Sequence, residues 1–143
     1  MLSLPIPMFS SLVLGFLLVR LWVSGRRHGP LVGLLALCAV QGVIMSLAQH
    51  YLVPGMIVVQ ALGAVLIPPM AWVAFETTAV RAYRRGDLWH FGWPLVVAGC
   101  ILTEPVVLDV LIPGLFVGYG LPVLRHALKG ADALPRMRLE AGD

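Results

Sequence analysis

Apolar residues run along this chain in long blocks, and polar residues gather between the blocks. A helix needs about 20 mostly apolar residues to cross about 30 Å of hydrocarbon. Five segments approach that pattern, and the shortest of them needs its flanking residues in order to span. We therefore predict an all-α integral membrane protein, a bundle of about five transmembrane helices near residues 3–23, 30–52, 55–83, 88–102 and 106–124.

The composition agrees with lipid as the main solvent of the chain. Hydrophobic residues make up 59% and charged residues 12% of the 143 residues, and the mean hydropathy is +0.92. A soluble domain has about 45–50% apolar and about 25% charged residues. No soluble domain or linker is visible, so residues 1–130 are predicted as one transmembrane bundle and residues 131–143 as a short cytoplasmic tail.

The basic residues give the predicted bundle an orientation, because lysine and arginine concentrate in cytoplasmic loops. With five spans, all ten fall on one side, which places the N-terminus outside and the C-terminus in the cytoplasm. A four-span alternative, in which 88–102 only re-enters the membrane, would divide them between both faces. The net charge of +3 then reflects a rim that meets anionic lipid rather than nucleic acid. These residues are Arg20, Arg26, Arg27, Arg81, Arg84, Arg85, Arg125, Lys129, Arg136 and Arg138.

The third predicted helix contains the adjacent prolines Pro68 and Pro69 within "LIPPMAW". Proline removes a backbone hydrogen bond and clashes with the preceding turn. Such a break is tolerated inside a membrane where neighbouring helices satisfy the freed groups. The sequence therefore predicts a kink at Pro68-Pro69, and it places Glu76 near the cytoplasmic rim.

A few polar residues interrupt the half of the bundle that is predicted to face outside. Gln41, Gln49 and His50 lie on the second helix and Gln60 on the third. Polar side chains in membranes usually hydrogen-bond across helices, at about 0.6 kcal/mol on average. The functional alternative is a polar cavity that opens to the outside and admits a small ligand.

Three ionisable residues, His50, Glu104 and Asp109, fall on the predicted outer face, where no lysine or arginine is present to pair with the acids. A carboxylate near lipid tends to take up a proton or find a donor. These residues are therefore candidates for sensing pH or binding a cation. In the simpler interpretation Glu104 caps the turn "TEP" and stays hydrated.

Small residues spaced four apart recur on two helices and predict close helix packing. Gly114 and Gly118, followed by Gly120, lie on the last helix, and Gly42 with Ser46 on the second. The spacing leaves open whether they join helices of one chain or of two.

Catalytic and metal-binding motifs are not found in the sequence. It contains no GxSxG, HExxH, P-loop or dinucleotide fingerprint. Cys38 and Cys100 fall in apolar spans without metal-ligand spacing, and His28, His90 and His126 lie at the inner rim. We therefore predict neither an enzyme nor a cofactor or metal site.

Several stretches resemble one family: "LLALCAVQGVIMSL", "ALGAVLIPPMAWVAF", "LWH", "LFVGYGLPVLR" and "GADALPR". They look like the integral-membrane N-terminal region of membrane-bound AraC-type transcription regulators of proteobacteria. In that family the membrane region is similar to a seven-helix bundle, and a cytoplasmic helix-turn-helix domain follows it. Because this sequence stops at Asp143, the resemblance implies either a truncated or fragmentary member without its DNA-binding domain or a stand-alone paralogue of the sensor part.

The resemblance implies a sensor or regulatory module, multi-pass in the bacterial inner membrane, without direct nucleic acid contact from this chain. Its expected partners are the lipid bilayer and either a second copy of the chain or another membrane protein. Two other functions remain open. One is a small transporter or half-transporter, and the other is a structural membrane subunit that needs a partner.

Overall fold

The computed structural model describes residues 5–25 and 29–129, and within these residues the chain is helical with no strand. Six α-helices form its frame: α1 (Ile6–Val23), α2 (Gly29–Gln49), α3 (Met56–Ala64), α4 (Ile67–Phe75), α5 (Trp93–Thr103) and α6 (Leu108–Leu128). A π-helical turn, η1 (Glu76–Val80), extends α4, and two 3-10 helices, η2 (Arg85–Gly92) and η3 (Pro105–Val107), precede α5 and α6.

Four helical segments in the described part are long and apolar enough to cross a membrane: α1, α2, the 25 residues Met56–Val80, and α6. The fifth predicted span differs. α5 has 11 residues, which at 1.5 Å per residue is about 16 Å, roughly half of the hydrocarbon thickness. Pro94 lies in the first turn of α5, where its missing N–H would have no helical partner in any case.

The predicted ends of the other helices lie within about four residues of the observed ones where they can be compared. The predicted start at residue 3 and the predicted cytoplasmic tail, 131–143, lie outside the described residues.

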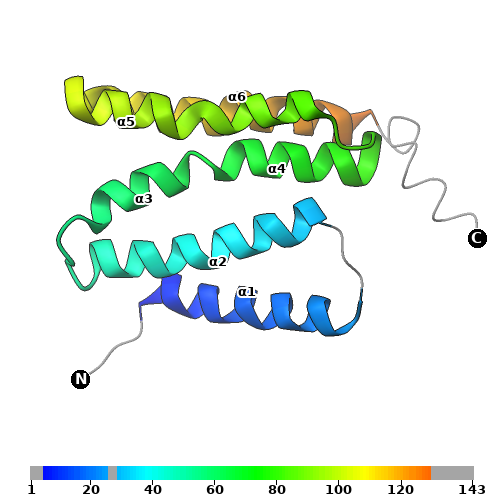
Figure 1. Cartoon of the computed structure of the whole chain (residues 1–143), viewed down its shortest axis with the longest axis horizontal. Coiled ribbons are helices and arrows are strands. Elements are labelled where there is room, and N and C mark those ends of the chain that lie inside the picture. The colour runs from blue at the N-terminus through cyan, green and yellow to red at the C-terminus, as the bar shows by residue number, and fades with distance from the viewer. Residues whose placement is uncertain (1–4, 26–28, 130–143) are drawn as a thin grey trace, which may run out of the picture.

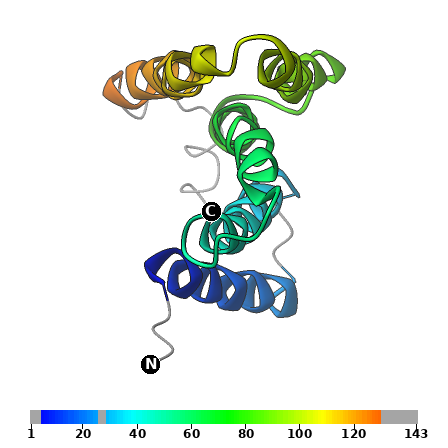
Figure 2. The ribbon, with the colours of Figure 1, turned by 90° about the vertical axis from the view of Figure 1, so that its left-hand side faces the viewer.

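The helices form a layered stack (Figures 1 and 2). α1 packs against α2, and α2 packs against α3 and α4. On the other side of α3 and α4, helices α5 and α6 lie next to each other and diverge, one towards each flank (Figure 2). Each reversal of the chain makes neighbouring layers antiparallel, so α1, α3–α4 and α6 run in one direction and α2 and α5 in the other (Figure 1).

This antiparallel order gathers the lysine and arginine side chains of the described residues at one end of the stack (Figure 1). We call it the basic end, because the last turns of α1 and α6 and the segment after η1 meet there. The acidic end, at the α5–α6 turn, carries Glu104 and Asp109. The basic side chains of the described part all belong to the basic end: Arg20, Arg81, Arg84, Arg85, Arg125 and Lys129.

The predicted kink corresponds to a break between α3 and α4. Val65 and Leu66 form a turn, and the helical ladder resumes where the Met70 N–H donates to the Leu66 carbonyl at 3.1 Å. The break thus lies just before Pro68 and Pro69 rather than at them. It lies there because a proline frees the carbonyl four residues earlier and crowds the turn before it, whereas in the first turn of α4 its missing N–H would have no helical partner anyway.

The break lies at the centre of the hydrophobic core. Val65 is 0% exposed and packs with Val97 of α5, also 0% exposed, and Leu115 of α6, 7% exposed. Val65, at the interruption, therefore contacts both neighbouring helices. A change in the angle between α3 and α4 would shift its packing against α5 and α6.

The predicted small pair of α2, Gly42 and Ser46, packs within the chain. Ser46 is buried, and a Cβ atom built on Gly42 would lie 2.8 Å from the Pro7 carbonyl oxygen and in contact with the Ser11 hydroxyl. Gly42 therefore lets α1 approach α2 closely. The predicted packing glycines of α6 differ, because Cβ atoms built on them meet nothing within 4 Å in the described part; these are Gly114, Gly118 and Gly120.

Candidate functional site

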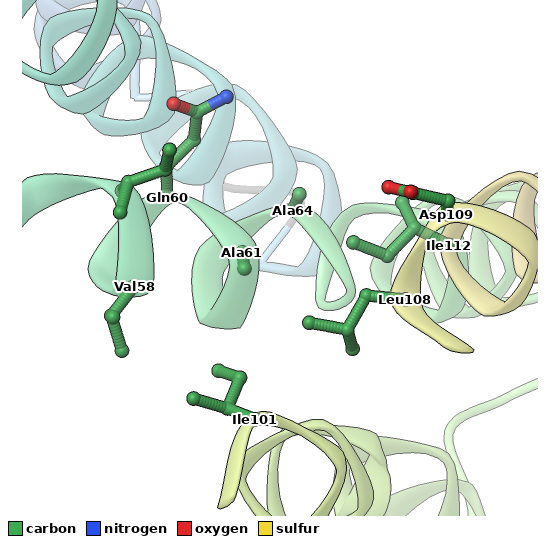
Figure 3. A pocket seen from close by; sticks show the side chains of 9 residues that line it. Val58, Gln60, Ala61, Ala64, Ile101, Leu108, Asp109 and Ile112 are labelled. Atoms are coloured by element: carbon green, nitrogen blue, oxygen red, sulfur yellow. The ribbon is translucent and has the colours of Figure 1, made fainter. Parts of the chain in front are cut away.

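A groove at the acidic half of the stack is the first candidate site (Figure 3). It has a volume of about 460 Å³ and is bounded by α3, α5 and α6. Its walls are apolar, with Ile101 from α5 and Leu108 and Ile112 from α6, and two small residues of α3, Ala61 and Ala64, leave the space open. The volume lies within the range of about 300–1,000 Å³ that is usual for small-molecule sites.

Asp109 supplies the charged group of this groove. It belongs to the first turn of α6, where the helix dipole favours a carboxylate. Figure 3 shows its carboxylate extending from α6 in the direction of Ala64, which lines the same groove. The ion pairs between described residues are both made by Arg81 at the basic end, so they leave this carboxylate available to a ligand.

The glutamines that the sequence singled out lie in different surroundings, some at a helix–helix contact and one at the surface. The Gln41 Nε2 group donates to the backbone carbonyl of Gln60 at 2.8 Å, so that α2 and α3 are joined by the kind of interhelical hydrogen bond that the structural interpretation expected. The Gln60 amide extends away from the groove towards α2 (Figure 3). Gln49, at the end of α2, is exposed.

The predicted outer group of His50, Glu104 and Asp109 is not joined by any hydrogen bond or ion pair within the described part of the chain. His50 follows α2, which packs against α1, α3 and α4 rather than at the α5–α6 turn, and its ring makes an edge contact with Tyr51. Glu104 ends α5 and is exposed. Of the three, Asp109 alone lines the groove.

A second candidate site, at the basic end, was not predicted as a site from the sequence. Arg81 bridges two acids: its Nε lies 2.9 Å from Glu76 Oε2, and its two terminal nitrogens donate to the Asp87 carboxylate at 2.7 and 3.1 Å. The acid side chains are 8% and 6% exposed and the arginine side chain 28%. We call these three residues the arginine clamp.

The clamp joins two elements, η1 and η2, which the sequence predicted only as the end of a helix and the loop after it. Glu76 begins η1, and Asp87 lies in η2, where its carboxylate also accepts the backbone N–H of Arg84 at 2.9 Å. One signal was present in the sequence: a glutamate that ends an apolar span needs a cation nearby, and Arg81 is the nearest one along the chain.

The clamp also favours the ionised form of Asp87. Hydrogen bonds from Arg81, and then the N–H of Arg84, hold the pKa of the Asp87 carboxyl below its usual value, while burial opposes them. The hydrogen bond with Asp87 in turn raises the pKa of the Arg81 guanidinium. Because the folded-state pKa of Asp87 is lowered, its stabilising contribution is present above the unfolded-state pKa and is lost as the pH falls through the folded-state value.

Aromatic and histidine side chains link the helices near the basic end. The Tyr119 hydroxyl of α6 accepts the indole N–H of Trp93 at 3.0 Å and lies 2.7 Å from Nδ1 of His90. The ring of His126 makes edge contacts with Trp72 and Phe75 of α4. Two of the three histidines that the sequence placed at the inner rim, His90 and His126, therefore help to hold α6 against its neighbours, and His28 lies outside the described residues.

No protein-family model, curated protein or solved structure matches this chain. What the fold and the sites define is an all-helical protein in which four helices of the described part are able to span a membrane, with an apolar groove at its acidic half and an arginine clamp at its basic end.

Proposed function

We propose that this protein is a multi-pass module of the bacterial inner membrane that senses or regulates, of the kind implied by its resemblance to the membrane region of AraC-type regulators. Four apolar spans support the membrane location. The absence of a catalytic motif in the sequence favours a regulatory role over an enzymatic one. In this proposal the output is passed to a partner, because no nucleic acid contact is assigned to this chain.

The single observation that carries the proposal is the interrupted helix, α3 followed by α4. Its α3 half lines the groove through Ala61 and Ala64, and its α4 half continues through η1 into the arginine clamp. The break at Val65 is packed between α5 and α6. A ligand that favours one angle between α3 and α4 would shift the population of that angle and move the basic end.

The orientation proposed for this module places the basic end in the cytoplasm, following the positive-inside rule. A reporter fused after Asp143 should then be active in the cytoplasm, and a reporter inserted between Val53 and Pro54 should be active outside. Paired alkaline phosphatase and green fluorescent protein fusions measure this directly. Reports from the same side at both positions would show that the chain crosses the membrane an even number of times between them, contrary to the three crossings of the proposal.

The regulatory role is tested by making the interrupted helix continuous. Replacing Pro68 and Pro69 together by alanine restores two backbone donors to the ladder. We expect the variant to insert normally but to fail in signalling, because α3 and α4 then move as one rod. The measurement compares transcript profiles of the native host lacking the gene, complemented with the wild type or with the double variant.

Membrane level, measured by quantitative blotting, serves as the control for insertion in this comparison. A second control replaces Pro113, which is exposed and belongs to α6 rather than to the interrupted helix, by alanine, and it should complement like the wild type. If loss of the gene leaves the transcript profile unchanged, or if the double variant complements fully, the regulatory proposal fails.

A structural subunit is the second candidate, favoured by the half-length of α5 and by the open glycine face of α6. A partner helix, from another protein or a second copy of this chain, would cover both. A transporter is less well supported, because it needs ionisable groups near the midplane of the spans. The charged side chains of the four described spans instead lie near their ends.

A further inference from the structure

The groove bounded by α3, α5 and α6 is closed on one side by the core of the protein. Ala61, Ile101, Leu108 and Ile112 line the groove and also pack against the core. The groove therefore has a floor of core side chains, and its lining runs along α3 from Ile57 to Ala64. A space of about 460 Å³ with such a floor has room for a compact apolar group.

The charge around the groove determines which sign of charge its ligand should carry. Asp109 is the charged residue among those that line it, and Glu104 lies at the same end. The lysine and arginine side chains of the described residues all lie at the opposite, basic end. A cation approaching the acidic end is therefore attracted and an anion repelled, and contact with apolar walls strengthens the attraction by lowering the local dielectric.

We propose that this groove binds a small hydrophobic amine, with its ammonium group on the Asp109 carboxylate and its apolar body against Ala61 and Ala64. The inference rests on the proposed function and names the chemical class of its ligand. Gln60 does not take part through its side chain, because its amide extends towards α2 (Figure 3). The ligand enters from the acidic end, which the proposed orientation places outside the cell.

The test uses the full chain, purified in an uncharged maltoside detergent, and isothermal titration at pH 7 with 4-phenylbutylamine. At this pH an alkylamine is protonated, as lysine is. The matched probes are 4-phenylbutan-1-ol, which keeps the apolar body without the charge, and 4-phenylbutyrate, which reverses the charge. We expect the amine to bind at least about fivefold more tightly than the alcohol, in line with a partly hydrated ion pair, and the anion not to bind measurably.

Two variants locate the binding. Asp109→Asn should weaken amine binding about five- to tenfold and leave the alcohol unchanged, whereas Ala64→Phe should fill the groove and remove both. Glu104→Gln is the matched control, because it neutralises the other acid of this end outside the groove; it removes only a solvent-screened attraction and should bind the amine within about twofold of the wild type. Circular dichroism checks that each variant keeps its helix content. Because Asp109 is exposed, the Asp109→Asn variant should fold, and its amine affinity decides the test even if Ala64→Phe does not fold.

Equal affinities for the amine and the alcohol, or an unchanged amine affinity in Asp109→Asn, would overturn the proposal. So would loss of amine binding when phosphatidylethanolamine is added to phosphatidylcholine nanodiscs, because a lipid ammonium would then be the occupant. Binding is measured on purified protein and regulation in cells. Failure of the amine to bind therefore leaves the regulatory proposal intact, and failure of the transcript test leaves the binding result intact.

Discussion

Replacing Arg81 with methionine should destabilise the protein by about 3 kcal/mol, the largest effect we expect from a single substitution. The change removes the cation that serves both Glu76 and Asp87. Two nearly buried carboxylates would be left without a cation, and a buried charge without its counter-charge costs more than the ion pair itself contributes. Thermal and denaturant unfolding in maltoside detergent, followed by circular dichroism, measure the loss.

The matched control for the clamp is Arg85→Met, which makes the same chemical change at an exposed arginine of η2 and should alter the unfolding free energy by less than about 0.5 kcal/mol. A triple variant, Arg81→Met with Glu76→Gln and Asp87→Asn, removes the stranded charges and should recover part of the loss. If Arg81→Met unfolds like the wild type, the clamp does not hold the end of α4 as described.

Replacing Gly42 with leucine should destabilise the protein by about 2–3 kcal/mol by forcing α1 away from α2. A Cβ atom at this position would lie 2.8 Å from the Pro7 carbonyl oxygen, and backbone atoms cannot turn aside as a flexible side chain can. α1 packs against α2, so loss of this contact should release the first helix. Detergent-solubilised unfolding measures the stability, and limited proteolysis reports the release of α1.

Gly99→Leu makes the same change on α5, where a Cβ atom meets nothing within 4 Å in the described part. Because leucine favours helix over glycine, this control should be neutral or slightly stabilising. A Gly42→Leu variant as stable as the control would mean that α1 and α2 do not meet at this glycine.

The sequence by itself predicted four of the five spans that we expected, as helices long and apolar enough to cross a membrane, and the gathering of the basic side chains at one end. Apolar blocks of about 20 residues predicted the four helices able to span a membrane, because hydrophobic length is a local property of the chain. The spacing of the basic residues between these blocks predicted that they share one end. Pro68 and Pro69 predicted the interrupted third helix to within a few residues, because the effect of proline is confined to the preceding turn.

Only the tertiary structure decided which residues meet. Gly42 with Ser46 and Gly114 with Gly118 have the same spacing, yet one pair packs against a helix of the same chain and the other faces open space. The spacing cannot distinguish them, because it does not say which face of a helix has a neighbour.

The same reason separates the predicted outer cluster from the observed sites. His50 and the two acids were grouped by the side of the membrane they should share, but α2 packs away from the α5–α6 turn, so Asp109 faces an apolar groove instead. Glu76 was placed near the rim without a partner, and the fold of η1 and η2 brings Arg81 between it and Asp87. Helix length and the side of the membrane on which a loop should lie can be predicted from the local sequence. Contacts between helices depend on how the helices are rotated and packed.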